Sequence, residues 1–224
     1  MARQLSFDLP SRSAARREDF YVSPSNATAV ALIESWESWP ARKLVLAGPV
    51  SAGKTHLAHV WSDLSGATIV SSPDLVDADI PALAANHVAI EDADQIVGNR
   101  AGEEALFHLH NLTLAEGHSL LFTARAAPSH WPLILPDLAS RLQATPTCTL
   151  SRPDEDLLWA VLMKLMGDRQ ILPTPGTIPY LVRHMPRDFD AATRVVAALD
   201  QLALERRRPV TRALAAEVLD KLQL

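Results

Sequence analysis

An eight-residue stretch has the residue types of a phosphate-binding loop. Residues 48–55 read Gly-Pro-Val-Ser-Ala-Gly-Lys-Thr and fit the pattern G-x-x-x-x-G-K-[ST]. In such a loop the backbone N–H groups surround the phosphates, a helix N-terminus adds positive potential, and the lysine reaches the β- and γ-phosphate oxygens. An apolar run precedes the motif and a helical pattern follows it. We therefore expect a nucleotide phosphate site formed by Val50, Ser51, Ala52, Gly53, Lys54, Thr55 and His56.

Two adjacent acids supply the second half of this chemistry. Glu91 and Asp92 follow the apolar run 88–90, about 37 residues after Lys54. A carboxylate there can hold Mg²⁺ through water, with the Thr55 hydroxyl as a further ligand, and the adjacent acid can orient the attacking water. We assign Glu91 to Mg²⁺ and Asp92 to the water. The commoner order is Asp then Glu, so the reversed order puts fast hydrolysis in doubt. A solvated strand end is the alternative reading of the pair.

The elements that would position these residues follow an α/β pattern. Short apolar runs alternate with helical patterns, which indicates a parallel sheet with right-handed crossovers. The five predicted strands are 43–47, 67–70, 87–90, 119–123 and 145–150. The predicted helices between and before them are 25–39, 54–64 and 103–116, with a short helical turn at 138–142.

The pattern changes at Ser151, after which no strand signal remains. We expect a helix from Ser151, capped by that serine, to about Gly167, then a proline-rich break that includes Pro179, then helices at 187–207 and 211–222. The predicted organisation is a flexible tail at 1–18, an α/β domain at 19–150 and a small three-helix lid domain at 151–224.

Composition excludes several classes of protein. The formal net charge is −5, which argues against non-specific electrostatic binding to DNA or to an anionic membrane. Cys148 is the single cysteine, so an internal disulfide and a cysteine zinc cluster are excluded. No stretch approaches the ~18 apolar residues of a membrane span, and the first residues do not form a secretory signal. We expect a cytoplasmic protein.

The motifs together resemble the DnaA-type AAA+ ATPases. The resemblance covers about residues 18–222 and rests on segments 19–27 and 48–57. Segment 136–142, Pro-Asp-Leu-Ala-Ser-Arg-Leu, is closer to the Hda-type regulators, which are small paralogues of the initiator. The resemblance implies a P-loop AAA+ domain with a five-stranded parallel sheet followed by an all-α lid, with ADP or ATP and Mg²⁺ as ligands. It also leads us to expect no DNA-reading domain after the lid.

The resemblance carries roles to individual positions of this sequence. Arg141 matches the arginine finger, which acts on the nucleotide of a neighbouring molecule. Thr123 matches the first sensor near the γ-phosphate, although the segment after it, 125–128, matches the family only in part. Arg187 matches the second sensor, which would reach the nucleotide of its own chain. The adenine and ribose would be contacted by Phe20, Tyr21, Val22 and Asn26.

A short apolar cluster in the tail resembles the peptide with which Hda-type proteins bind the β sliding clamp of DNA polymerase III. The residues that would enter the clamp are Gln4, Leu5, Phe7 and Leu9. A glutamine amide with spaced apolar anchors suits a peptide-in-pocket contact. Packing of the tail onto its own domain is the alternative.

These observations lead to one expected function and to alternatives from other classes. The resemblance implies a negative regulator of replication initiation that binds ADP, docks on the clamp, and stimulates ATP hydrolysis by the initiator DnaA. It would have weak ATPase activity at most, be associated with the nucleoid or replisome, and lack sequence-specific DNA binding. A finger contact also allows head-to-tail self-association. The alternatives are a DnaA-related ATPase or loader with its own activity, a nucleotide-binding adaptor, and a small-molecule kinase.

Overall fold

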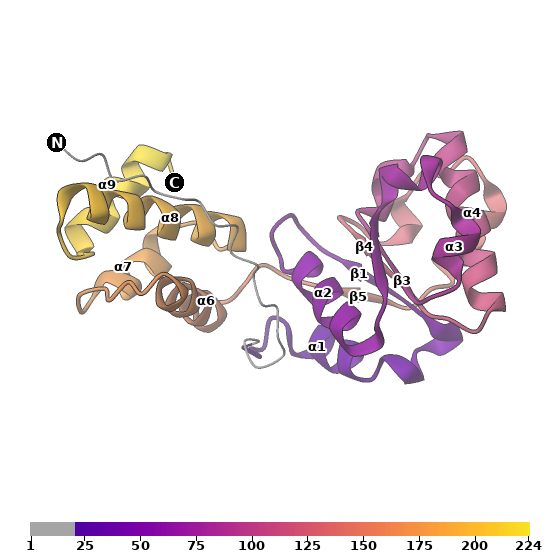
Figure 1. Ribbon diagram of the computed structural model, residues 1–224, viewed down its shortest axis with the longest axis horizontal. Helices are drawn as coiled ribbons and strands as arrows, with labels where there is room; N and C mark the ends of the chain where they lie inside the picture. The colour runs from indigo at the N-terminus through magenta and orange to yellow at the C-terminus, as the bar shows by residue number, and fades with distance from the viewer. Residues whose placement is uncertain (1–20) are drawn as a thin grey trace.

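The computed structural model describes residues 21–224, as an α/β part followed by a helical part (Figure 1). The predictions for the clamp-binding peptide at Gln4, Leu5, Phe7 and Leu9 and for Phe20 lie outside the described residues. Among residues 21–224, no helix has the length and apolar character that crossing a bilayer requires.

The α/β part is built on one parallel sheet. The strands run in the order β2-β3-β4-β1-β5, and the pairings are all parallel. This confirms the predicted fold class. The order also places the ends of β1, β3 and β4 next to one another, at one edge of the sheet. The strand bounds are β1 (Lys43–Ala47), β2 (Thr68–Ser71), β3 (Val88–Glu91), β4 (Leu120–Ala124) and β5 (Thr147–Thr149).

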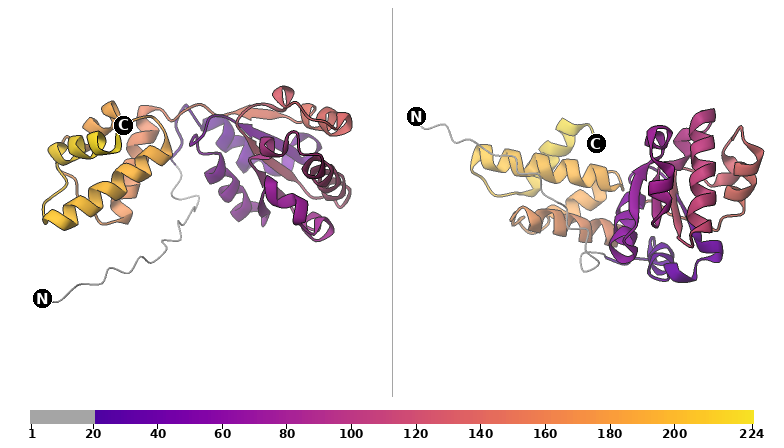
Figure 2. Two further views of the ribbon diagram at one scale, coloured as in Figure 1. Left: turned by 90° about the horizontal axis from the view of Figure 1, so that it is seen from above. Right: turned by 45° about the vertical axis from the view of Figure 1, so that its right-hand side comes forward.

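Helices cover both faces of the sheet, and the alternation of strand side chains decides which core each residue joins. In β1, Leu44 and Leu46 pack with helices α1 and α2, whereas Val45 and Ala47 pack on the opposite face with α4 and α5. Figures 1 and 2 show the two helical layers on either side of the sheet. The helix bounds are α1 (Ala27–Glu34), α2 (Lys54–Ser65), α3 (Ile80–Ala84), α4 (Arg100–Ala115) and α5 (Pro136–Gln143).

The helical part has a hydrophobic core of its own and four helices among the described residues: α6 (Glu155–Asp168), α7 (Thr177–His184), α8 (Phe189–Arg206) and α9 (Arg212–Leu222). The expected three-helix lid with a proline-rich break was therefore wrong. Pro179 is the third residue of α7, where the missing N–H has no partner within the helix, so the proline does not prevent the helix.

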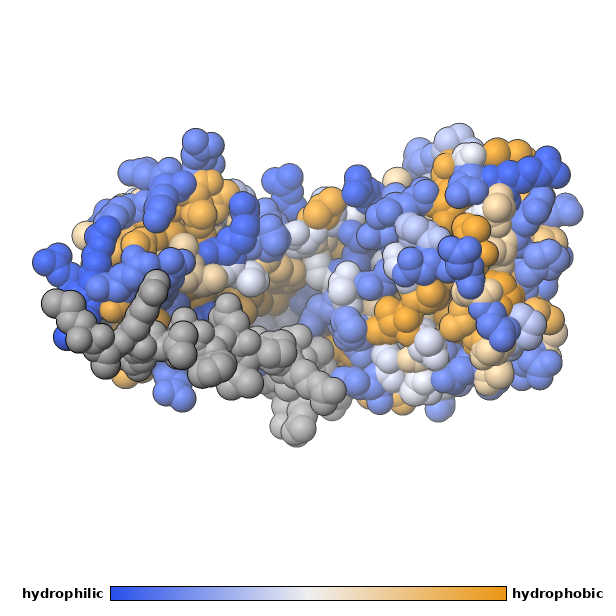
Figure 3. Space-filling view, turned by 45° about the horizontal axis from the view of Figure 1, so that its top comes forward, coloured by the Kyte–Doolittle hydropathy of each residue, from blue (hydrophilic) through white to orange (hydrophobic). Residues whose placement is uncertain are grey.

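Polar residues cover much of the visible surface of both parts (Figure 3).

Two predicted helix ends differ from the structure for identifiable reasons. Helix α1 ends at Glu34 rather than 39, because the Ser35 hydroxyl donates to the carbonyl of Ala31 at 2.7 Å and the Trp39 indole donates to the carbonyl of Leu32 at 2.7 Å. These bonds satisfy carbonyls that a longer helix would use. Helix α6 is capped by Asp154, which accepts from the N–H of Leu157 at 2.8 Å, and not by Ser151.

The first glycine of the phosphate-binding motif provides a test of this packing. A Cβ at Gly48 would lie 2.5 Å from the carbonyl oxygen of Leu150, a backbone atom that cannot turn aside. We expect Gly48→Ala to lower the free energy of unfolding by roughly 1–3 kcal/mol, as overpacking does. Urea unfolding measures it. Gly167→Ala in α6 is the control, because open space surrounds that glycine; equal destabilisation by the two variants would contradict the account.

Candidate functional site

The loop between β1 and α2 has the backbone shape that a phosphate site needs. Gly53, with φ of 94°, precedes the first residue of α2, and Ser51 also has a positive φ, of 58°. Only glycine adopts the Gly53 conformation without strain. Helix α2 therefore begins at Lys54 with its unpaired N–H groups at the end of the loop, which favours an anion. Val50 and Thr55 are exposed beside it.

The Lys54 amino group is buried within this loop. It donates to the carbonyl oxygens of Gly48 at 2.8 Å and of Pro49 at 2.7 Å. Burial is the largest influence on its pKa and lowers it, whereas Asp92 and Asp94 act in the opposite direction. The sheet therefore brings the lysine and the acids after β3 into one electrostatic environment.

The acids at the end of β3 have different partners. One carboxyl oxygen of Glu91, Oε1, is buried without a hydrogen-bond partner in the structure. Asp92 has a left-handed backbone with φ of 49°, and its N–H donates to the hydroxyl of Thr123 at 3.0 Å. Its carboxylate accepts from the amide of Gln95 at 3.1 Å. The unpaired Glu91 oxygen fits a Mg²⁺ ligand, because hard cations prefer carboxylate oxygens.

Two further charged residues lie at this edge and were missed by the sequence reasoning. The N–H of Arg125 donates to Asp94 Oδ2 at 3.2 Å, and the other oxygen of Asp94 is buried without a partner in the structure. Arg125 also contributes to the lowered pKa of Lys54. The signal was available, because Arg125 directly follows β4 and the carboxyl ends of parallel strands share one edge.

The segment assigned to the adenine and ribose is attached to the first lid helix. Asn26 accepts from the N–H of Ser23 at 2.8 Å and donates to the carbonyl of Tyr21 at 3.0 Å, so its side chain folds the segment rather than capping α1. Asp154 accepts from the N–H of Ser25 at 3.2 Å. Burial opposes ionisation of Asp154, but hydrogen bonds from Leu157 and this segment outweigh it and lower the pKa. Tyr21 and Val22 are exposed.

The lid reaches the phosphate loop through a residue that the sequence analysis did not assign. The N–H of Phe189 donates to the carbonyl of Ser51 at 3.2 Å, and its ring lies so close to Gly53 that a Cβ there would be 2.8 Å away. Arg187, predicted to reach the nucleotide, pairs with Glu155 at 2.5 Å, and both side chains are more than half exposed. An aromatic residue at a helix start gives no functional signal in the sequence.

Arg141 lies away from the phosphate loop of its own chain. It is exposed in the last turn of α5, and its guanidinium carbon lies 5.3 Å from the centre of the Phe107 ring. Its carbonyl accepts from the amino group of Lys43 at 3.0 Å. Lys43 begins β1, whereas the loop follows its last residue, and five strand residues span about 16 Å. The side chain is therefore available to another molecule.

A buried lysine–histidine pair lies beneath Arg141. The amino group of Lys43 is 3.2 Å from Nε2 of His110, and both side chains are almost fully buried. Burial, and then the Lys43 charge, lower the pKa of His110 to about 4. Burial and the charge of Arg141 lower the pKa of Lys43. In this pair a neutral imidazole can accept a hydrogen bond from the ammonium group.

Known structures have a similar fold. Domain III of the replication initiation protein DnaA from Thermotoga maritima is similar to the chain with a TM-score of 0.82 and 17% identity, covering 95% of this chain and 98% of that one. The chain has a DnaA-like AAA+ fold. AMPPCP-bound DnaA from Aquifex aeolicus has a TM-score of 0.69 and 13% identity over 85% of this chain and 68% of that one. A RuvB mutant of Thermotoga maritima has a TM-score of 0.67 and 16% identity over 89% and 68%.

The relatives found by sequence include a DnaA initiator and an uncharacterized protein. The chain is 25% identical over 228 residues to the initiator DnaA of Thermomicrobium roseum, covering 90% of this chain and 48% of the initiator. It is 24% identical over 234 residues to an uncharacterized protein of Haemophilus influenzae, covering 98% and 100%. No protein-family model matches the chain. The chain thus spans about half the length of the Thermomicrobium roseum initiator.

The buried imidazole of His110 makes a pH dependence testable. Because the unfolded chain binds this proton near pH 6.5 and the folded chain near pH 4, the free energy of unfolding falls as the pH drops through that window. We expect His110→Gln to remove roughly 3 kcal/mol of this dependence at most. Urea unfolding at several pH values measures it. The exposed neighbour variant His108→Gln is the control; a wild-type slope in His110→Gln would contradict the assignment.

Proposed function

We propose that the chain binds an adenine nucleotide, with Mg²⁺, at the loop 48–55. The proposal is supported by the left-handed Gly53, the N-terminus of α2 and the buried Lys54, which together would form a site for phosphate. Thr55 and the unpaired oxygen of Glu91 would hold the metal. Asp92 would orient water, and Thr123 holds the backbone of Asp92. The similar DnaA structure with AMPPCP supports a nucleotide at this fold.

We further propose that the chain acts in trans, as an Hda-type regulator that promotes ATP hydrolysis by a DnaA-type initiator. The observation that carries this is the exposed Arg141, which lies about one strand length from its own loop and has no carboxylate partner among residues 21–224. A guanidinium supplied to another molecule's triphosphate stabilises charge in the transition state. Its acceleration is roughly 10³–10⁵-fold in related phosphoryl-transfer enzymes.

In this proposal the chain's own nucleotide, ADP, has a structural role. Phe189 and Asp154 already connect the lid to the loop and to the segment before α1. A nucleotide between them would fix the angle of the lid. The tail residues Gln4, Leu5, Phe7 and Leu9 would dock on the β sliding clamp, placing the chain at the replisome in the cytoplasm.

A second candidate is an ATPase or loader that works as a head-to-tail assembly of this chain. The acids Glu91 and Asp92, together with Arg125, give the loop the groups for hydrolysis. Arg141 of one copy would then act on the nucleotide of the next. The two candidates differ in which molecule hydrolyses ATP.

Nucleotide binding should depend on Lys54. We expect Lys54→Met to weaken ADP binding about 10- to 100-fold, since a hydrogen bond to a charged group contributes about 1.5–3 kcal/mol. Isothermal titration calorimetry measures the affinity. Lys221→Met, in the last turn of α9, is the control for loss of one positive charge. Wild-type protein that binds neither ADP nor ATP would exclude the nucleotide proposal.

Stimulation of the initiator should depend on Arg141. With clamp-loaded DNA and ATP-bound initiator, we expect Arg141→Ala to lower the stimulated hydrolysis by about 10³-fold while leaving ADP binding unchanged. Arg42→Ala is the control, because Arg42 precedes β1 near the same edge and is also exposed. Equal stimulation by wild type and Arg141→Ala would refute the trans role. Turnover by this chain alone that needs Arg141 would favour the second candidate.

A further inference from the structure

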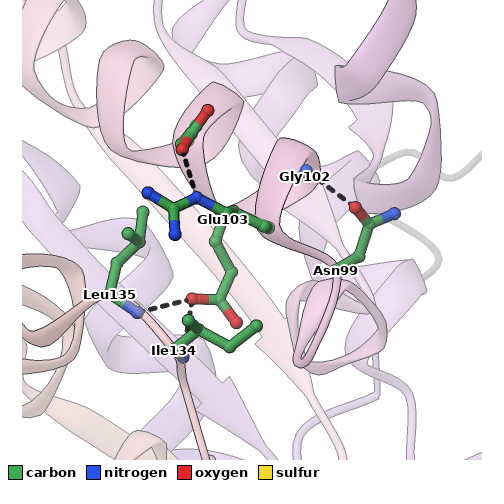
Figure 4. Close-up of polar contacts among 7 residues, drawn as sticks. Asn99, Gly102, Glu103, Ile134 and Leu135 are labelled. Carbon is green, nitrogen blue, oxygen red and sulfur yellow. Dashed lines mark hydrogen bonds and ion pairs between the residues drawn. The ribbon is translucent and has the colours of Figure 1, made fainter.

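A buried acid holds the chain where it enters the helix that carries Arg141. Glu103 on α4 is fully buried, and its Oε2 accepts from the N–H groups of Ile134 at 2.8 Å and Leu135 at 2.9 Å (Figure 4). Its other oxygen accepts from the N–H of Gly98 at 3.0 Å. Leu135 is the residue before α5 and cannot cap it with its own side chain. Glu103 therefore supplies the polar contacts at this entry.

The burial of the Glu103 carboxyl group needs an explanation, because removing such a group from water costs free energy. An unpaired carboxyl group in a protein interior loses its hydration, and three accepted N–H bonds compensate for that loss. Two of these bonds go to the loop that leads into α5, about thirty residues later in the chain. The carboxyl also lies near the N-terminus of α5, where negative charge is favoured. Its contacts therefore fix the position of that end of the helix.

The other end of α5 is held by positive charge. The buried Lys43 amino group and the Thr145 hydroxyl both donate at 3.0 Å to the carbonyl oxygen of Arg141 itself. A cation at a helix C-terminus complements the helix dipole. His110 accepts the remaining contact of the lysine and keeps it in place. The backbone carbonyl of Arg141 is thus hydrogen-bonded to the side chain of the first residue of β1.

Residues on one face of α4 contact both ends of α5. Glu103, Phe107 and His110 are spaced four and three residues apart, so they lie on the same side of the helix. Glu103 holds the entry to α5, Phe107 lies under the guanidinium of Arg141, and His110 holds Lys43. The same stripe therefore contacts the start of α5, the side chain of Arg141 and the lysine at its end.

We propose that Glu103, Phe107 and Lys43 are positioning residues for Arg141: they set the direction in which α5 presents its guanidinium to a partner's triphosphate. This inference rests on the proposed trans role of Arg141. Small displacements of a catalytic group reduce rates strongly, by about 10²-fold for roughly 1 Å. A finger on a two-turn helix needs such support, because short helices are marginal without tertiary contacts.

The first variant is Glu103→Gln, which keeps the shape of the side chain but has only one acceptor oxygen. Its amide N–H₂ group must then face a backbone N–H that donated to the carboxylate, so hydrogen bonding on that side is lost. We expect the maximal stimulated rate to fall about tenfold. The concentration of this chain that gives half-maximal stimulation should change little. The matched control is Glu104→Gln, the exposed neighbour that pairs with Arg100 at 2.9 Å, and it should stimulate like wild type.

The decisive comparison is made in the Arg141→Ala background. If Glu103 acts through Arg141, Glu103→Gln has no further effect on stimulation there, whereas a general loss of structure lowers the residual rate in both backgrounds. Arg141→Ala with wild-type stimulation would instead refute the trans role, and this inference with it. An equal fall in both backgrounds would overturn the positioning role alone.

A measurement without any partner completes the test. The Arg141 guanidinium lies over the Phe107 ring, so the NMR resonance of its side-chain Nε–H depends on its position relative to that ring. We expect this resonance to shift or broaden in Glu103→Gln and to stay unchanged in Glu104→Gln. Should Glu103→Gln not fold, Phe107→Leu and Lys43→Met take its place, with circular dichroism to verify folding. An unchanged Arg141 resonance together with an unchanged maximal rate in the folded variants would overturn the proposal.

Discussion

The phosphate loop depends on the hydrogen bonds that the buried amino group of Lys54 donates to the loop's own backbone. A lysine removed from water needs hydrogen-bond acceptors, and here the carbonyl oxygens of Gly48 and Pro49 provide them. After these two residues the loop turns through Ser51 and Gly53, which both have a positive φ. The motif is therefore a closed hydrogen-bonded loop, and a phosphate would compete for the lysine with the loop's own backbone.

The parallel sheet separates the two functional regions. Strands that run in one direction place Lys54, Asp92 and Thr123 at their carboxyl ends, where the loop and the lid meet. The opposite edge carries Lys43, where α5 ends. The proposed nucleotide site and Arg141 therefore lie at opposite edges of the sheet. This geometry suits a head-to-tail contact, in which each surface meets a different molecule.

The sequence predicted the strands and the loop well because both signals are local. Runs such as 43–47 are buried on both faces, and Lys54 follows a fixed motif. Contacts between residues far apart in the chain are harder to predict from the sequence. Glu103 looks like a solvated acid beside Glu104, and only the fold shows that it reaches Leu135. Similarly, nothing local distinguishes Phe189 from a core aromatic residue, although it contacts the phosphate loop.

The error in the number of lid helices has the same origin. Proline predicts a break by its local effect, but its cost vanishes at the third residue of a helix, and Pro179 occupies that place in α7. Arg187 was assigned by resemblance as the second sensor, and the structure pairs it with Glu155 from another helix. Breaking an exposed pair of this kind costs little. In the proposed nucleotide complex, the Arg187 guanidinium would therefore exchange Glu155 for a phosphate at small cost.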